Sequence, residues 1–175
     1  MPRSIATTGR ASPPWPGYGA RGTLVLPLPG SWLESLPPLL EVDGVVLGRK
    51  SEAHLTLLDR KAAAQVRRAC AEAVVRAAFL AQDWSMQATG ERWLLRKDLP
   101  SGRTAHALIT MVDAPGFAAF RAALGRACGV ELPEAMAHVT LYVAGKPTGI
   151  GLPDVAAFHR LRVKRVDAGG APQAS

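Results

Sequence analysis

The chain has 175 residues, and its 21 Lys and Arg outnumber its 14 Asp and Glu, which gives a formal net charge of +7. Apolar residues make up 48% of the chain, a content that excludes an intrinsically disordered protein. No stretch approaches the roughly 20 consecutive apolar residues of a membrane-spanning helix, so no membrane association is expected. Two cysteines, Cys70 and Cys128, are too few for a disulfide framework. The positive charge fits either an anionic partner or a role in solubility.

Composition divides the chain into one domain and two tails. Residues 1–21 are basic, lack acidic residues and are rich in Pro and Gly, which predicts a disordered tail. Residues 168–175 predict a second disordered tail, and the domain spans residues 22–167. No apolar leader follows Met1, and the prolines oppose the amphipathic helix of a transit peptide. We therefore expect a cytoplasmic protein, and we expect it to be a monomer.

The first half of the domain predicts mainly strands, followed by one long helix that begins after Asp59 as its N-cap. Apolar residues recur at helical spacing along that helix, and Cys70 is among them as a small buried hydrophobic residue. The expected elements are a strand at 23–27, a brief helix at 31–40, a strand or turn at 44–48, a strand at 53–58 and the long helix at 60–82.

The second half predicts a hairpin, two further strands around a helix, and a last strand. Pro115 opens the expected helix and Gly129 ends it, with Cys128 as a second buried hydrophobic residue. The expected elements are hairpin strands at 84–88 and 92–96, a strand at 103–112, a helix at 116–127, and strands at 137–143 and 158–166. Two helices among about eight strands predict an α+β domain with mainly antiparallel sheet. The similar order of elements in the two halves indicates an old duplication.

Two of the four histidines lie in nearly identical short motifs. One motif is Ala-His-Leu-Thr-Leu at 53–57, and the other is Ala-His-Val-Thr-Leu at 137–141. Successive side chains of a strand point to opposite faces, so His54 shares a face with Thr56, and His138 shares a face with Thr140. Each motif presents an imidazole and a hydroxyl about 7 Å apart along the strand.

Two such strands at the centre of a domain would place two imidazoles beside one groove. Histidine serves as general acid or general base because its pKa lies near neutrality. Cleavage of a phosphodiester needs both roles, and the Thr hydroxyls can donate to the non-bridging phosphate oxygens. This chemistry needs no metal or other cofactor. Two alternatives stay open: both residues are strand histidines with a packing role, or His54 and His138 bind zinc, for which no further ligand is suitably spaced.

The paired motifs at 54–57 and 138–141 resemble those of the 2H phosphoesterase superfamily, which includes the bacterial RNA 2′,3′-cyclic phosphodiesterases, also called 2′–5′ RNA ligases. The resemblance implies that His54 and His138 are catalytic and that Thr56 and Thr140 bind phosphate. It also implies a bilobal, pseudo-duplicated α+β fold, with two mainly antiparallel sheets, flanking helices and the active-site groove between the lobes. The sequence departs from many bacterial members after Thr56, where Leu58-Asp59-Arg60 replaces a Phe-Leu-Gly run.

Three more residues are candidates for substrate binding. Alternation places Tyr142 on the face of Thr140, where its ring can stack on a base or pack on the rim. His106 either lines the same groove or lies on the surface. Arg103 belongs to a basic cluster around the predicted hairpin that either holds phosphates or is a solvated face.

The expected function is a metal-independent phosphodiesterase whose partner is a nucleotide or short RNA with a 2′,3′-cyclic phosphate or a 2′–5′ linkage. The same site suits a cyclic oligonucleotide signal or an ADP-ribose cyclic phosphate. A nucleotide- or RNA-binding module without turnover is the non-enzymatic alternative. Ligation is the reverse of hydrolysis, and the sequence does not separate the two.

Overall fold

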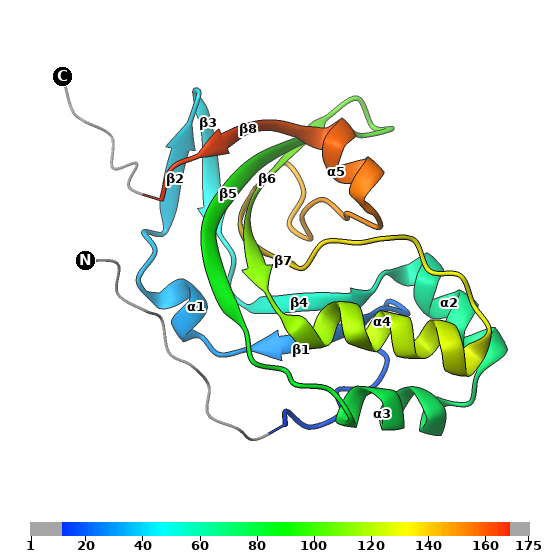
Figure 1. The fold of residues 1–175 in the computed structure, drawn as a ribbon. Coiled ribbons are helices and arrows are strands. Elements are labelled where there is room, and N and C mark those ends of the chain that lie inside the picture. Colours follow the sequence, from blue (N-terminus) through cyan, green and yellow to red (C-terminus); the bar gives the residue numbers. More distant parts are fainter. Residues whose placement is uncertain (1–11, 169–175) are drawn as a thin grey trace.

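The computed structural model describes residues 12–168, so the outer parts of both predicted tails, 1–11 and 169–175, lie outside the described residues (Figure 1). The described chain is an α+β domain whose eight strands form one antiparallel sheet. The predicted α+β class is therefore confirmed. The prediction of two separate sheets is wrong, because all eight strands are joined by hydrogen bonds in a single sheet.

The sheet follows the order β1-β4-β7-β6-β5-β8. Strand β7 pairs with β6 along one edge, and its other edge is shared by β4 and β3. Strand β2 pairs with the far side of β3. The strands are β1 (Leu24–Leu28), β2 (Leu39–Val42), β3 (Val45–Arg49), β4 (Ala53–Leu58), β5 (Gln87–Asp98), β6 (Thr104–Asp113), β7 (His138–Ala144) and β8 (Arg162–Val166).

Helices cover both faces of this curved sheet, as Figure 1 shows. The larger apolar cluster joins α2, α3 and α4 to β1, β4 and β7, with Val66, Phe79 and Phe120 at its centre. A smaller cluster joins Phe158 and Ile150 to one face of β5 and β6. The helices are α1 (Ser31–Glu34), α2 (Arg60–Ala69), α3 (Glu72–Leu80), α4 (Pro115–Cys128) and α5 (Val155–Leu161).

Several elements match their sequence predictions closely. Strand β4 has the predicted bounds, and β6 and β7 are shifted by one residue. Asp59 is the N-cap of α2 and accepts a hydrogen bond from the amide of Ala62 at 3.0 Å. Gly129 ends α4 in the left-handed conformation with φ 62°, as a C-terminal glycine commonly does.

The predicted helix at 31–40 is much shorter in the structure. Helix α1 stops at Glu34, and Pro37 and Pro38 cannot donate the amide hydrogen bonds that would continue it. The chain enters β2 instead, and Asp43-Gly44 turns it into β3, both residues with positive φ. An Asp-Gly pair is a strong hairpin signal, so this strand pair was identifiable from the sequence.

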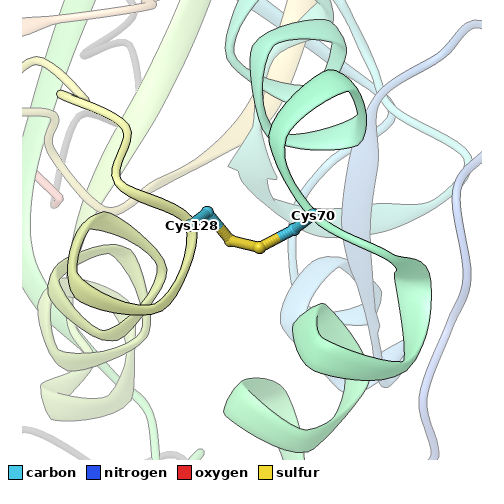
Figure 2. The surroundings of a disulfide bond; sticks show 2 residues. All are labelled: Cys70 and Cys128. Atoms are coloured by element: carbon cyan, nitrogen blue, oxygen red, sulfur yellow. A yellow bond between two sulfur atoms is a disulfide. The ribbon is translucent and has the colours of Figure 1, made fainter.

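The predicted long helix is broken at Cys70, whose backbone is extended. The break ends α2 beside the C-terminal end of α4, where the Cα atoms of Cys70 and Cys128 are 5.4 Å apart and the two residues form a disulfide (Figure 2). That separation lies within the range that a disulfide spans. The interpretation of the two cysteines as small buried hydrophobic residues within helices therefore missed their bond, because spacing in the sequence does not show which helix ends meet.

Two further predictions of secondary structure need correction. The expected hairpin at 84–96 is instead the single strand β5, which pairs with β6 and is irregular between Ala88 and Arg92. The expected strand at 158–166 begins as helix α5, since Asp154 caps a helix by accepting a bond from the amide of Ala157 at 2.7 Å. Only the last five residues of that stretch form β8.

The inner part of the predicted N-terminal tail packs on the domain. The ring of Trp15 meets Phe79 edge to face, with centroids 5.4 Å apart, and its Nε1 donates to Glu72 at 3.2 Å. Tyr18 bridges to Leu24 and lies under the guanidinium of Arg67. The ordered domain therefore begins before residue 22. Among the described residues, no helix is both long and apolar enough to cross a membrane.

Candidate active site

The two His-x-Thr motifs lie on neighbouring strands. Leu55 of β4 pairs with Val139 of β7, and the strands are antiparallel. This register places His54 opposite Thr140 and Thr56 opposite His138. Residues directly opposite have Cβ atoms about 5 Å apart, and diagonal neighbours such as the two histidines are separated by about 7–8 Å.

The two faces of this strand pair have different surroundings. Leu55 and Val139, both fully buried, anchor the pair in the larger apolar cluster. His54, Thr56, His138 and Thr140 are half-buried on the other face, which we call the His–Thr face. Two imidazoles and two hydroxyls therefore share one small region, as the motifs predicted.

The His138 ring is oriented by the chain that precedes it. Its Nδ1 lies 3.0 Å from the carbonyl oxygen of Met136. A carbonyl only accepts, so Nδ1 carries the proton, and the neutral ring has its lone pair at Nε2. In this tautomer Nε2 is available to accept a proton.

Both imidazoles have pKa values below the ordinary value of a histidine. Burial lowers the pKa of His54 most, Lys50 lowers it further and Glu52 opposes both. Burial also dominates at His138, where the bond to Met136 raises the pKa and the charge of His54 lowers it. The influence of His54 on His138 agrees with their diagonal placement on neighbouring strands. Both rings are therefore mainly neutral at pH 7 when no anion is bound.

A lysine and a glycine-rich turn lie beside this region. The backbone amide of Lys50 donates to Leu141, and its Nζ donates to the carbonyl of Pro147 at 3.0 Å. Gly149, with φ 77°, is adjacent to Thr140, since a Cβ placed there would be in van der Waals contact with its Cγ2 at 3.5 Å. The turn therefore lies against one phosphate-binding candidate, while Lys50 places a cation near His54. Neither feature has a recognisable sequence signal.

Tyr142 lies on the opposite face from Thr140, so the prediction that they share a face is wrong. Ile109 pairs with Thr140 and Leu108 pairs with Tyr142, which leaves Leu141 as an extra residue in β7. Such a bulge reverses the alternation beyond it. The Tyr142 ring is 1% exposed, and its hydroxyl donates to the carbonyl of Pro37 at 2.8 Å. Alternation alone does not reveal a bulge.

His106 and Arg103 are also away from the His–Thr face. His106 pairs with Ala144 and projects from the same face as Leu108 and Tyr142. The face of β6 that sequence analysis assigned wholly to core, with Ile109 and Met111, is the one that continues the His–Thr face. Arg103 precedes β6 at the end remote from His138, and it donates to the carbonyl of Gly145 at 3.1 Å.

The opposite face carries a cavity of about 720 Å³ between the β2–β3 hairpin and β8. Tyr142 lines it together with Arg92 and Val166. Lys164 and Asp43 form an ion pair of 2.7 Å across the same region. This cavity is separated from the His–Thr face by the sheet itself.

The described residues contain no group of three or more His, Cys, Asp or Glu arranged to hold a metal ion. In three comparisons, the chain matched no protein-family model, no curated protein and no solved structure.

Proposed function

We propose that the chain is a metal-independent phosphodiesterase of the 2H phosphoesterase type, acting on 2′,3′-cyclic phosphates or 2′–5′ linkages of RNA or nucleotides. The observation that carries the proposal is the antiparallel pairing of the two motifs, which puts each histidine opposite the other motif's threonine. The resulting square of two imidazoles and two hydroxyls can surround a single phosphate. General acid, general base and oxyanion donors are the groups that this reaction requires.

In the proposed hydrolysis, His138 is the base, because its Nδ1 proton is held by Met136 and its Nε2 is free to accept. Nε2 takes a proton from water, the water oxygen bonds to phosphorus, and the bond from phosphorus to a ribose oxygen breaks. His54, protonated, donates its proton to that leaving oxygen. Thr56 and Thr140 donate hydrogen bonds to the non-bridging oxygens, where negative charge increases in the transition state.

We also propose that the fold is bilobal and pseudo-duplicated, as in the superfamily that the motifs resemble. A pseudo-twofold axis through the Leu55–Val139 pair would exchange the two motifs, which is the relation expected of a duplicated unit. The predicted monomer stays a prediction. The predicted cytoplasmic location also remains a prediction, and the Cys70–Cys128 disulfide argues against it, because reducing compartments keep thiols reduced.

The proposal is tested by incubating the protein, in EDTA, with a nucleoside 2′,3′-cyclic phosphate, a 2′–5′ dinucleotide, a cyclic dinucleotide and an ADP-ribose cyclic phosphate. Turnover that is lost in His54→Ala and in His138→Ala, and kept in the matched control His159→Ala, would support it. His159 is exposed on α5. Binding without turnover of any of the four would favour the binding module instead.

A further inference from the structure

Residues 129–137 lead from α4 to His138, and they contain neither helix nor strand. We call them the approach segment. Backbone and side-chain bonds fasten it at several points: Gln65 Nε2 donates to Glu131 at 3.3 Å, and the amide of Val155 donates to Glu134 at 3.0 Å. The carbonyl of Met136, near its end, is the one that orients His138. The position of this segment therefore decides how His138 is presented.

Arg121 is the one charged residue of α4 that is buried, with 9% of its surface exposed. Its Nη1 donates to the carbonyl of Leu57 at 3.0 Å, and its Nη2 donates to the carbonyl of Pro133 at 2.8 Å. A guanidinium has a rigid fork of donors, so these two bonds fix the distance between both carbonyls. Arg121 thereby ties the end of β4 to the approach segment.

The two carbonyls that Arg121 binds flank the part of the His–Thr face that holds Thr56 and His138. Leu57 follows Thr56 directly, and the strand register places Thr56 opposite His138. Pro133 lies three residues before Met136, whose carbonyl accepts from the His138 ring. No other side chain is seen to bond both to β4 and to the approach segment in the described part of the chain.

We propose that Arg121 is a positioning residue, which holds the Met136 carbonyl against Nδ1 of His138 and keeps His138 in register with Thr56. Its effect on the rate rests on the proposed function, whereas its effect on the tautomer and titration of His138 does not. Arg121 donates to two backbone carbonyls and takes no part in proton transfer.

The direction in which the pKa of His138 changes distinguishes a positioning role of Arg121 from a direct effect of its charge. The bond from Nδ1 to the Met136 carbonyl favours the protonated ring and raises its pKa. When Arg121 is replaced and the carbonyl shifts away, the pKa of His138 falls. Loss of a nearby positive charge would have the opposite result and raise that pKa.

The test compares Arg121→Met with Arg126→Met, a control that removes an exposed arginine from the same helix. The pKa and tautomer of His138 are followed by nitrogen-15 NMR titration, and a free-thiol assay confirms that the disulfide is intact. We expect Arg121→Met to lower the pKa of His138 and to populate the Nε2–H tautomer. We also expect kcat to fall about tenfold or more with KM within about twofold, as for other residues that orient a reacting group. Arg126→Met should change none of these.

A pKa of His138 that rises or stays constant in Arg121→Met, with the Nδ1–H tautomer retained, would overturn the proposal. If that variant does not fold, Arg121→Gln takes its place, because its shorter side chain cannot reach both carbonyls and the same sign is expected. Absence of turnover in the unmodified protein would count against the proposed function alone, since the NMR titration decides the role of Arg121 without any substrate.

Discussion

Removal of the Cys70–Cys128 disulfide should destabilise the domain substantially. The bond joins residues 58 apart in sequence and links the ends of α2 and α4. In the chain-entropy account, a closed loop of that length contributes about 4 kcal/mol by restricting the unfolded chain. Domains of ordinary stability unfold with about 5–15 kcal/mol, so this bond would supply a large share of the total.

The assay is urea unfolding of the double variant Cys70→Ala/Cys128→Ala and of the unmodified protein, each with and without a reductant. We expect the variant to lose about 4 kcal/mol of unfolding free energy relative to the oxidised protein. We also expect the reductant to remove most of that difference from the unmodified protein and to leave the variant unchanged. Alanine keeps the apolar Cβ contacts, which makes the loss of the bond the main change.

A difference below about 1 kcal/mol, together with two titratable thiols in the unmodified protein, would refute this reasoning, since the expected contribution is several times larger. The two helix ends would then meet without a covalent bond. A protein with the bond intact and an equally small loss would instead show that the unfolded chain retains structure which already brings these ends together.

Three further predictions concern the His–Thr face and its reverse side. Because both imidazole pKa values are lowered, kcat/KM should follow a bell-shaped pH profile with its maximum below about pH 6.5, and a flat profile between pH 5 and 8 would contradict paired acid–base roles. The pKa of His138 is lower in the folded protein than in the unfolded chain, so the unfolded chain binds more protons in this pH range. The free energy of unfolding should therefore fall as the pH drops from about 6.5 through the pKa of the folded state. His138→Gln should make the free energy of unfolding, measured with urea at several pH values, depend less on pH. Tyr142→Phe should cost about 1 kcal/mol of stability, by loss of the bond to Pro37, and leave kcat/KM within about twofold; a tenfold loss of kcat/KM would show that Tyr142 acts at the site.

Local signals predicted the parts of this structure that depend on local chemistry. The alternation in β4, the Asp59 cap and the Gly129 terminus are each fixed by a few neighbouring residues, and the structure has all three. The facing of each His-x-Thr motif was also predicted correctly, since the irregularities of β4 and β7 come after the threonine of each motif.

Predictions failed where a distant contact decides the local conformation. Cys70 lies in a sequence with helical periodicity, yet the chain is extended there and the residue bonds to Cys128. Arg121 was not a candidate, because an arginine within an apolar helix gives no sign of the two carbonyls that it will bond. The partner in each case comes from another part of the chain, and a single sequence does not show which parts meet.

The bulge at Leu141 separates two surfaces that simple alternation would have merged. Without the extra residue, Tyr142 would project beside Thr140. With it, Ile109 of β6 and the turn at Gly149 border Thr140, while the aromatic ring is enclosed on the other face. A bulged strand bends locally, and the bulge residue also accepts the amide of Lys50, at the point where the edge of β7 passes from β3 to β4. The residue that makes the prediction for Tyr142 wrong therefore also binds the backbone of Lys50, whose charge lowers the pKa of His54, and the bulge is thus part of the construction of the proposed site.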